Sequence, residues 1–571
     1  MNEEIIEKAR TMTAVLPYSK EAIEFMISRG FDTPAKIRNF LEFNPAMLRS
    51  MPLMNDAGRF IARVLEAVNN KEHIVVYGDY DCDGVMGTAI AIKVLRMLGA
   101  ECDYFINNRV TEGFGMNTAG MQKLHGVYPD AKLIITVDNG IASAEGIAWA
   151  AERGIDTVVS DHHVLPETAS LPKCPVVDEW RTDEYEADRE CMCGAELIRR
   201  LMIETVKSAG RYDELKDELD KLVSLSGCAT IADSVPMTAA NHYIASEGLK
   251  HINAYDYPCW KAAREIMISG SGKLDSSSIG FYFGPMINAA SRMTGEAGLA
   301  VEFALADSDK EAETYAMLLK KLNEQRRSAT AKYTAEAESE IAASGRANDH
   351  FLIAQGNGDI PAGIAGLVCS SVVSNHHVPA VCLSPSDDPD IMKGSGRSAG
   401  GFDLKAALDK CAPLLVTYGG HKEACGLTIR KENIEMFRNI MDVFAETYCR
   451  NTDMEEHIDF YIEPADLSMK MINEFTHILA PFGTGFEAPA WSLTGELKSQ
   501  AGETYHTVGK NTVKFTLKRD GAETDCIWFG GKPRTDKMRS SGIMQAKGTP
   551  SINSFNGHDS IQFIVRDAEC L

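Results

Sequence analysis

Three aspartates at alternate positions, Asp79, Asp81 and Asp83, have the residue type and the spacing of a metal-binding site. They follow the apolar run 74–77 and precede Gly84 in the string IVVYGDYDCDG. Carboxylates this close repel one another, and each is expensive to desolvate alone. A bound divalent cation removes both penalties, so the spacing predicts a metal site at the end of a buried strand.

This acidic string has two other possible interpretations. A calcium loop of the EF-hand type needs a bidentate Glu at its twelfth position and a helix on each side. Counting from Asp79, the twelfth residue is Ile90, and a predicted strand precedes the motif, so the EF-hand is excluded. A solvated acidic turn remains the alternative.

The elements that must position these carboxylates repeat further along the chain. Residues 133–137 (LIITV) predict a second apolar strand, residues 143–154 a helix, and residues 157–160 a third strand. Strand, helix and strand with short connections form a βαβ unit, which implies a parallel sheet. In open α/β sheets the functional crevice lies outside the carboxyl ends of the strands.

Further candidate ligands follow these predicted strands. Asp138 ends the second strand, Asp161, His162 and His163 end the third, and Asp233 ends a fourth predicted strand in CATIADSVPM. Carboxylate oxygens combined with imidazoles suit Mn²⁺, Mg²⁺ or Zn²⁺ better than Ca²⁺. Asp233 alone is weak evidence, because Ala-Asp-Ser is an ordinary strand exit.

These strings also carry a family resemblance. GDYDCDG, VDNG, SDHH and ATIADSVPM resemble, in this order, the four metal-binding motifs of the DHH phosphoesterase superfamily. Further strings are similar to successive blocks of the bacterial RecJ single-strand-specific exonucleases: NRVTEGFGMN, GPMINAASRM, GSGRS, GGHKEACGL and PFGTGFEAPAW. The resemblance covers nearly the whole chain.

The resemblance implies two divalent metal ions, Mn²⁺ or Mg²⁺, held close together for phosphodiester cleavage. Asp79 and Asp161 would orient ligands or backbone, and His163 would face the scissile phosphate or the leaving group. Asp138 would bridge the two ions. The implied ligands are Asp81, Asp83, Asp138, His162 and Asp233.

The resemblance also implies residues that hold the substrate. Arg109, Asn288 and Arg292 match positions for its phosphates, and Ser395, Arg397 and His421 match a pocket for the terminal 5′ phosphate. Neighbouring glycines would let backbone N–H groups approach that anion, and Arg397 offers a bidentate fork. These glycines are Gly394, Gly396, Gly419 and Gly420.

The chain departs from the family pattern at two places. Tyr77 stands where some members carry a His, which puts the coordination of one metal and the metal preference in question. Ile360 and Pro361 stand where Trp-His often precedes the glycine pair Gly363 and Gly366, so a substrate contact is expected to differ there.

Composition sets the broad class. A chain of 571 residues is too long for a single hydrophobic core, so several domains are expected. Its content of 44% hydrophobic and 24% charged residues is typical of a globular protein. The sequence has no apolar run long enough for a bilayer, and its N-terminus lacks the apolar core of a secretory signal. We expect a cytoplasmic protein without a membrane partner, whose fourteen scattered cysteines are free thiols.

A net charge of −23 argues against duplex binding by the whole surface, but a local basic channel remains compatible with it.

The predicted fold class is α/β, with a DHH-type parallel-sheet catalytic domain at 71–305 and an N-terminal helical region at 1–70 packed on it. A connecting helix at 306–345 begins with Ser308 and Glu311 as a capping box and stops near Gly345. We expect its charged residues to form mostly a solvated face; contact of Arg326 or Arg327 with nucleic acid is the less favoured alternative. A DHH-associated α/β domain is predicted at 346–450.

Short strands bounded by Gly and Asp predict a small β-barrel at 451–571, for which the family implies an OB-fold. Between Glu496 and Pro550 ten basic residues outnumber six acidic ones, with Tyr505, Phe515, Trp528 and Phe529 among them. This segment could bind single strands by stacking and charge; alternatively, the aromatics fill the barrel. The basic residues are Lys498, Lys510, Lys514, Lys518, Arg519, Lys532, Arg534, Lys537, Arg539 and Lys547, and the acidic ones Glu496, Glu503, Asp520, Glu523, Asp525 and Asp536.

By resemblance, the chain is expected to be a metal-dependent 5′-to-3′ exonuclease that releases 5′-mononucleotides from single-stranded DNA in recombination and repair. A monomer is expected, with a single-strand-binding protein and a RecQ-type helicase as partners. One alternative is a DHH phosphoesterase acting on pyrophosphate, short oligonucleotides or cyclic dinucleotides. The other is a catalytically silent DHH scaffold that binds DNA or replication partners.

Overall fold

The computed structural model describes residues 3–166, 169–181, 190–268, 273–449, 457–498, 505–509, 511–532, 535, 542–555 and 558–571. The chain divides into two compact units. One holds Leu53–Asp233 and Gly248–Glu455, and the other holds Met1–Pro52, Ser234–Glu247 and Glu456–Leu571. Among the described residues, no helix is both long and apolar enough to cross a membrane.

A parallel five-stranded sheet forms the base of the larger unit, with the order β2-β1-β3-β4-β5. Every neighbouring pair in this sheet is parallel, which confirms the predicted βαβ topology. Both β1 and β3 are buried along their whole length, because helices cover both faces. The strands are β1 (Ile74–Gly78), β2 (Cys102–Ile106), β3 (Leu133–Val137), β4 (Asp156–Ser160) and β5 (Val176–Val177).

Glycines allow the first turns of helix α6 (Cys82–Met97) to pack in close contact with the strands of the sheet. A Cβ atom on Gly84 would lie 2.6 Å from the Cβ of Asp79, and one on Gly87 would lie 2.5 Å from Val137. The other helices of this region are α5 (Ala57–Asn70), α7 (Thr118–Val127), α8 (Ala144–Ala151), α9 (Gly194–Ser208), α10 (Tyr212–Lys221), α11 (Val223–Ala232), α13 (Pro258–Ala262), η2 (Ala263–Ile268), α14 (Ser276–Ser278), η3 (Ile279–Phe283), α15 (Gly284–Thr294) and α16 (Gly298–Leu305). Helix α12 (Ala239–Ala254) is divided, since its residues up to Glu247 belong to the smaller unit.

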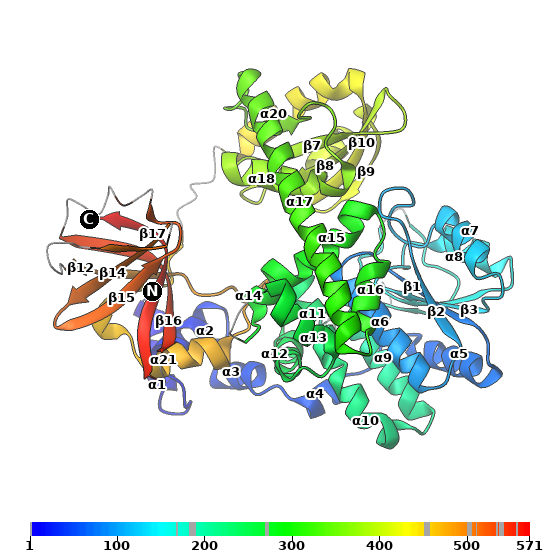
Figure 1. Cartoon of the computed structure of the whole chain (residues 1–571), viewed down its shortest axis with the longest axis horizontal. Helices are drawn as coiled ribbons and strands as arrows, with labels where there is room; N and C mark the ends of the chain where they lie inside the picture. The colour runs from blue at the N-terminus through cyan, green and yellow to red at the C-terminus, as the bar shows by residue number, and fades with distance from the viewer. Residues whose placement is uncertain are drawn as a thin grey trace. The chain divides into compact units, whose positions relative to one another are not determined.

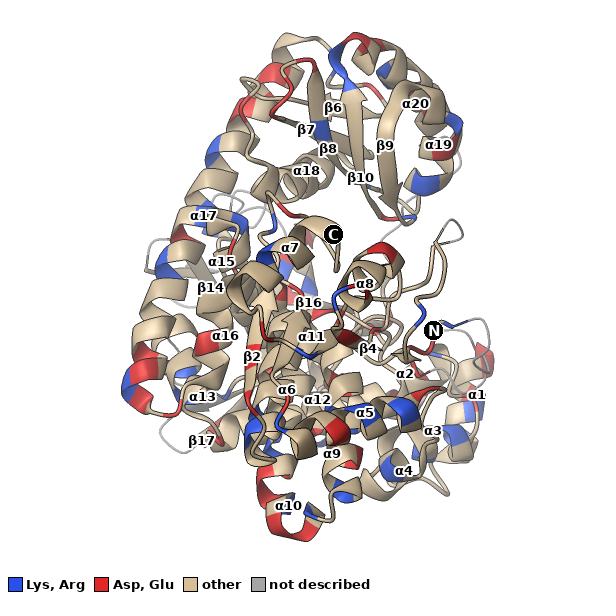
Figure 2. Ribbon diagram, turned by 90° about the vertical axis from the view of Figure 1, so that its right-hand side faces the viewer, with Lys and Arg blue, Asp and Glu red and all other residues tan. Residues whose placement is uncertain are grey.

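A single helix, α17 (Asp309–Ala343), continues from this region to a second sheet within the same unit (Figure 1). Ser308 caps its first turn by accepting a hydrogen bond from the backbone N–H of Glu311, and Gly345 follows with φ +69°. The helix therefore begins at the predicted serine cap and ends shortly before the predicted glycine stop. Figure 2 shows basic and acidic residues mixed along α17.

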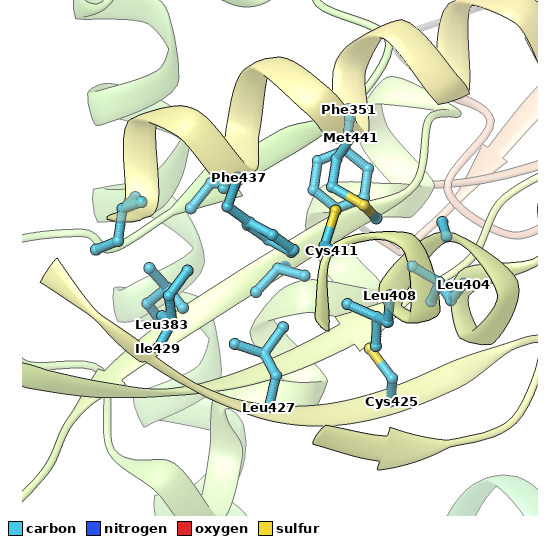
Figure 3. Close-up of a cluster of buried hydrophobic side chains, with 14 of the residues drawn as sticks. Phe351, Leu383, Leu404, Leu408, Cys411, Cys425, Leu427, Ile429, Phe437 and Met441 are labelled. Atoms are coloured by element: carbon cyan, nitrogen blue, oxygen red, sulfur yellow. The ribbon is translucent and has the colours of Figure 1, made fainter. Parts of the chain in front are cut away.

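The second sheet has the strand order β6-β7-β8-β10-β9. Helix α20 lies across one face of this sheet and buries Phe437 and Met441 against Leu383, Leu427 and Ile429 (Figure 3). The elements are β6 (Leu352–Ala354), α18 (Ala362–His376), β7 (Ala380–Pro385), β8 (Ile391–Arg397), α19 (Leu404–Lys410), η4 (Ala412–Leu414), β9 (Leu415–Gly420), β10 (Ala424–Arg430), η5 (Lys431–Asn433) and α20 (Ile434–Cys449).

The smaller unit contains a sheet with the strand order β11-β12-β16-β17-β15-β14-β13. An additional pairing between β12 and β14 closes five of its strands into a ring, which confirms the predicted small barrel. Its elements are β11 (Phe460–Ile462), η6 (Pro464–Asp466), α21 (Met469–Glu474), η7 (Phe475–Leu479), β12 (Trp491–Leu497), β13 (His506–Val508), β14 (Thr512–Arg519), β15 (Ala522–Trp528), β16 (Ile543–Phe555) and β17 (His558–Cys570).

Residues from the start of the chain pack against this C-terminal unit. Phe25 on α2 makes edge contacts with the rings of Phe475 and Phe486, and Arg29 forms an ion pair with Asp459 at 2.8 Å. The predicted N-terminal region 1–70 is therefore divided, because only Leu53 and later residues group with the parallel sheet. The helices involved are α1 (Glu3–Met12), α2 (Lys20–Ser28), α3 (Pro34–Leu41) and α4 (Pro45–Ser50).

Two local predictions were wrong. Asp233 does not end a strand: it is the C-terminal cap of helix α11, which is buried on nearly every side and therefore lacks a helical hydrophobic period. Gly394 and Gly396 lie inside strand β8, which is paired on both sides, so their backbone N–H groups face neighbouring strands and not a bound anion. These glycines instead make room for Leu427 and Cys425.

Candidate metal centre

The carboxyl ends of three parallel strands and the end of α11 meet at one site in the larger unit. Three groups of side chains there have ligand atoms within 4.8 Å of one another, so each group could hold a metal ion. Asp138 and His162 each belong to two of these groups, which makes them the shared residues. The groups are Asp79, Asp81 and Asp138; Asp83, His162 and Asp233; and Asp138, His162 and His163.

Backbone N–H groups fix the two carboxylates at the start of α6. Asp81 caps this helix by accepting hydrogen bonds from the N–H groups of Asp83 (3.0 Å) and Gly84 (3.2 Å). Asp83 accepts from the N–H groups of Gly194 (2.7 Å) and Ala195 (2.8 Å), at the start of α9. The alternate spacing of these aspartates therefore follows from the tight turn between β1 and α6.

Asp138 is the central carboxylate of the site. It is 2% exposed, and its backbone adopts a left-handed conformation with φ +62°. Its Oδ1 lies 3.0 Å from the Nε2 of His162, and this oxygen is buried without a hydrogen-bond partner among the described residues. A buried carboxylate oxygen in this state needs a cation or a proton.

His162 is surrounded by carboxylates. Its Nε2 lies 3.6 Å from Asp83 and 3.8 Å from Asp233, in addition to the close contact with Asp138. Burial lowers the pKa of His162, which favours the neutral imidazole that binds metals.

The pair Asp161 and His163 stands next to this cage. The carboxylate of Asp161 accepts hydrogen bonds from the backbone N–H of Ile141 at 2.9 Å and from Nδ1 of His163 at 2.8 Å. Burial opposes protonation of His163, but the Asp161 carboxylate outweighs it and raises the pKa of His163 to about 10. The hydrogen bond to Asp161 thus fixes the ring orientation of His163 and favours its protonated form.

Crowding of negative charge decides what the site can do. Burial, followed by repulsion from neighbouring aspartates, holds the pKa of Asp79 and of Asp138 well above the usual range. The same causes raise the pKa of Asp233 to about 9. Because a divalent cation would remove this repulsion, the donor set of carboxylate oxygens and imidazole nitrogens fits Mn²⁺ or Mg²⁺.

Sequence reasoning missed one acid beside the site. Asp178 follows strand β5 and is fully buried, and burial, followed by the charge of Asp161, raises its pKa to about 9. The string PVVDEW carries the same signal as the other strand ends, an apolar strand followed by an aspartate. The strand is only two residues long, which is why the pattern is hard to recognise.

Tyr77, at the position where some family members carry a His, does not enter the cage. Its hydroxyl donates a hydrogen bond to Oδ1 of Asn107 at 2.5 Å, and its ring is part of the core under α7. The ligands that the sequence analysis predicts therefore come together without a contribution from this position.

The predicted phosphate-binding arginines lie within electrostatic reach of one another. The guanidinium of Arg109 stacks on the ring of Tyr80 with 4.5 Å to the centroid. Arg292 donates a hydrogen bond to the carbonyl of Gly363 at 3.4 Å. Burial, followed by the positive charges of Arg109, Arg326 and Arg397, lowers the pKa of Arg292 to about 9.

The remaining predicted substrate residues lie on α15 and on the second sheet. Asn288 precedes Arg292 by one helical turn, and its Oδ1 is buried without a partner among the described residues. Ser395 and Arg397 alternate along β8 and therefore face the same side of the sheet. His421 lies in the turn before Ala424, which pairs with Arg397.

The glycine pair in α18 fits closely around two of the arginines. A Cβ atom on Gly363 would lie 2.3 Å from the carbonyl of Arg292, and one on Gly366 would lie 2.6 Å from Nη2 of Arg397. Ile360 is buried and Pro361 is the N-terminal cap of α18. The departure from Trp-His at these two positions therefore leaves the helix start intact.

The predicted aromatic surface of the barrel is only partly present. Phe515 and Trp528 are buried in the barrel interior, as the alternative interpretation expects, whereas Phe529 is 65% exposed. The charged residues Glu503, Lys510, Arg534, Asp536, Lys537 and Arg539 lie outside the described residues.

Comparison with family models places three known domains on the chain. The DHH family N-terminal domain matches residues 73–227, the DHHA1 domain residues 348–447, and the RecJ OB domain residues 458–567. These matches fall on the parallel sheet, the second sheet and the barrel, respectively.

Solved structures share this fold. RecJ from Thermus thermophilus in complex with Mn²⁺ aligns with a TM-score of 0.79 at 23% identity, covering 99% of this chain and 78% of that one. An exonuclease RecJ bound to manganese aligns with a TM-score of 0.58 at 26% identity, covering 71% of this chain and 98% of that one.

Curated relatives extend the match to sequence. The single-stranded-DNA-specific exonuclease RecJ of Dickeya dadantii is 32% identical over 518 residues, which cover 88% of each chain. RecJ of Haemophilus influenzae is 30% identical over 524 residues, again 88% of each chain. The chain belongs to the RecJ family of single-stranded-DNA-specific exonucleases.

Proposed function

We propose that this protein is a metal-dependent exonuclease that hydrolyses single-stranded DNA from the 5′ end and releases 5′-mononucleotides in recombination and repair. The observation that carries the proposal is the cage of buried carboxylates around His162, in which Asp138 and His162 are shared between neighbouring groups of possible ligands. The substrate is that of the curated RecJ relatives.

Two divalent cations, Mn²⁺ or Mg²⁺, are the cofactors we propose. When bound, such ions neutralise the phosphate and lower the pKa of bound water, so that a nucleophile is available at neutral pH. The unpartnered Oδ1 of Asp138 and the raised pKa values of its neighbours support this assignment. The residues that would hold the ions are Asp81, Asp83, Asp138, His162 and Asp233, with Asp79 and Asp161 as supporting residues.

The side chains outside the cage bind and orient the substrate. Arg109, Arg292 and Asn288 would hold phosphate oxygens, because guanidinium groups form short charge-assisted bonds with them. Nδ1–H of His163 donates a hydrogen bond to the Asp161 carboxylate, which leaves Nε2–H of the protonated ring to donate a hydrogen bond to the scissile phosphate or the leaving oxygen.

Recognition of the 5′ end is assigned to the second sheet. Ser395 and Arg397 share one face of β8. His421 lies in the turn between β9 and β10, just before Ala424, the residue that pairs with Arg397. Arg397 also contributes positive charge at Arg292, which belongs to the catalytic region. A terminal phosphate bound at Arg397 would place the first phosphodiester bond toward the cage.

A smaller substrate, such as a short oligonucleotide or a cyclic dinucleotide, is the second candidate. The same cage would serve it, but the barrel of 457–571 has no obvious role in such a reaction. A silent scaffold is disfavoured, because the cage has retained all of its carboxylate and imidazole donors.

One assay separates these candidates. End-labelled single-stranded DNA, duplex DNA and a dinucleotide are each incubated with Mn²⁺, Mg²⁺ or EDTA. We expect mononucleotides from the single strand with either metal, and none with EDTA. Asp81→Ala should reduce the rate by at least about 10³-fold, because it removes a proposed ligand.

The outcomes that contradict the proposal are distinct. Product from the dinucleotide alone would favour the small-substrate enzyme, and the absence of any product would favour the scaffold. Asp32→Ala is a suitable control, because this aspartate is half-exposed and lies on the surface of the smaller unit. It should leave the rate unchanged.

Several wider properties follow from the same proposal. The enzyme would act as a monomer in the cytoplasm, where thiols such as those of the free cysteines stay reduced. A single-strand-binding protein and a RecQ-type helicase are the proposed partners, since a helicase supplies single strands from duplex DNA. The domain boundaries at 71–305, 306–345, 346–450 and 451–571 remain predictions.

A further inference from the structure

The buried face of the connecting helix α17 changes character along its length. Near its start this face carries Ala312, Ala316 and Leu319, and near its end Ala337 and Ile341. These residues repeat at intervals of three or four, so they lie on one side of the helix. The two apolar ends therefore anchor α17 in the catalytic region and in the second sheet region, where Ala337 and Ile341 join a buried cluster.

The middle of the same face is polar. Asn323, Arg326, Thr330 and Thr334 continue the three- and four-residue spacing between the apolar ends. Helix α15, which carries Asn288 and Arg292, packs on α17, and α18 does so as well. The polar stretch thus occurs where the helix runs between the two sheets.

Each residue of this polar stretch has a buried atom without a partner. The atoms are Oδ1 of Asn323, Nε of Arg326, and Oγ1 of Thr330 and of Thr334; none has a hydrogen-bond partner among the described residues. Asn323 is only 9% exposed. Buried polar atoms are satisfied in the great majority of cases, so four in succession leave this face without the partners that a protein interior normally supplies.

The charge of the neighbourhood identifies the kind of partner. Arg292 lies within the electrostatic reach of Arg109, Arg326 and Arg397, which together lower its pKa. These guanidinium groups come from the segment after β2, from α15, from α17 and from β8. Cations gathered in a partly buried region require anions, and a chain of phosphates supplies them at regular spacing.

We propose that the polar middle of α17 is a phosphate-binding track for the substrate strand and that Arg326 is its substrate-positioning residue. This inference rests on the proposed function, because it takes single-stranded nucleic acid as the ligand. It adds the connecting helix to the binding surface, which otherwise consists of residues from the two sheets and α15. Figure 2 shows basic residues on α17 at the level of α15.

The neighbouring arginine provides a matched control. Arg327 is exposed, whereas Arg326 is partly buried on the polar face. Replacing either with Gln changes the net charge of the same helix by the same amount. Any difference between the two variants therefore reports the position of the guanidinium and not the total charge.

The first measurement is binding without turnover. A fluorescent 5′-phosphorylated oligodeoxythymidine is titrated with the full chain in EDTA at several salt concentrations. Arg326→Gln should weaken binding about tenfold, the size of one charge-assisted contact. The slope of log affinity against log salt should fall by about 0.7, as expected for one phosphate contact on a single strand. Arg327→Gln should change neither quantity appreciably.

The second measurement is steady-state cleavage with Mn²⁺. Arg326→Gln should raise KM about tenfold with kcat and the melting temperature unchanged, and Arg326→Lys should recover part of the loss. Equal weakening by Arg327→Gln, or unchanged binding in Arg326→Gln, would overturn the track. The track would also be overturned if Arg326→Gln lowered the melting temperature enough for partial unfolding to account for the whole loss of binding.

Failure of this inference and failure of the proposed function give different results. If the unmodified chain binds single strands but does not cleave them with either metal, the proposed exonuclease activity is overturned. The binding measurements on the Arg326 and Arg327 variants still test the role of Arg326. If it cleaves normally and both Gln variants behave alike, only the track fails. If it does not bind single strands at all, both are overturned.

Discussion

At the scale of single residues, the ligand candidates are held in place by the fold itself. Asp83 is fixed by two N–H groups at the start of α9, and Asp81 by those of its own helix. Sites that are supported by such hydrogen bonds reorganise little when a ligand binds. The carboxylates therefore stay together despite their repulsion, and the metal binds to a ready-made cage.

Arg397 gives a prediction about the end of the substrate. Arg397→Ala should reduce the preference for a 5′-phosphorylated over a 5′-hydroxyl oligonucleotide about tenfold, because one charge-assisted contact with the terminal phosphate is lost. The preference is measured as the ratio of kcat/KM for the two substrates.

Lys393 provides the control for this variant. It lies on the same strand and the same face as Arg397, and it is exposed. Lys393→Ala should leave the ratio unchanged. A ratio that stays the same in Arg397→Ala would remove this residue from recognition of the 5′ end.

At the scale of elements, the ion pair between Arg29 and Asp459 joins α2 to the first strand of the C-terminal unit. Arg29 reaches both carboxylate oxygens, at 2.8 and 3.1 Å, and both side chains are mostly buried. Arg29→Ala should lower the stability of this unit by about 3 kcal/mol at pH 7, because it removes the guanidinium partner of a buried carboxylate. Amide hydrogen exchange of residues 20–28 locates the effect.

The same pair predicts a pH dependence. Burial alone would raise the pKa of Asp459, but the hydrogen bonds from Arg29 outweigh it and lower the pKa. A lowered pKa stabilises the fold fully above the unfolded value of about 3.9, and this contribution disappears as pH falls through the lower folded value. The difference between Arg29→Ala and the unmodified chain should thus shrink below about pH 4.

Lys36 provides the comparison for Arg29. It pairs with Asp32 at 2.8 Å, but both side chains are about half exposed. Lys36→Ala should change the stability by less than about 1 kcal/mol at any pH. A similar loss in both variants would mean that burial of the Arg29 pair has no special effect.

The parallel sheet and the connecting helix could be predicted from sequence because their signals are local. Each buried strand is a short apolar run that ends in an acid, and α17 begins at a serine cap and ends at a glycine. Asp233 was misplaced because α11 is apolar on all sides, so its sequence has no helical period. Strand β16 was not predicted, since it contains Pro550.

The candidate site was predictable to the extent that each ligand follows a recognisable element. The spacing could identify Asp81, Asp138 and His162 one by one, but not that Asp138 and His162 are shared between groups. That result depends on the register of neighbouring strands. Likewise, Arg326 and Arg327 are equivalent in sequence, and only the packing of α17 distinguishes them.

At the scale of the whole molecule, the smaller unit is assembled from three separate segments of the chain. The aromatic side chains of Phe25 and Phe475 share one core with Phe486, although they are far apart in sequence. Removing residues 456–571 should therefore leave α2 without its packing partners, and its amides should exchange at the rate of an unfolded peptide.

The control for this truncation is the exchange of strand β1. Its partners β2 and β3 both lie within the larger unit, so its amides should remain protected in the shortened chain. Protection of α2 in the absence of residues 456–571 would show that the N-terminal helices form a stable unit by themselves.

The discontinuous construction of this unit also constrains biosynthesis. A ribosome adds roughly 5–20 residues per second, so the segment 1–52 is synthesised roughly 20–80 seconds before synthesis of the segment 456–571 begins. During that interval Phe25 and its neighbours form an exposed apolar surface on the nascent polypeptide, because their packing partners Phe475 and Phe486 have not been synthesised. The chain is thus exposed to aggregation during translation, and a chaperone would find an apolar target in this segment.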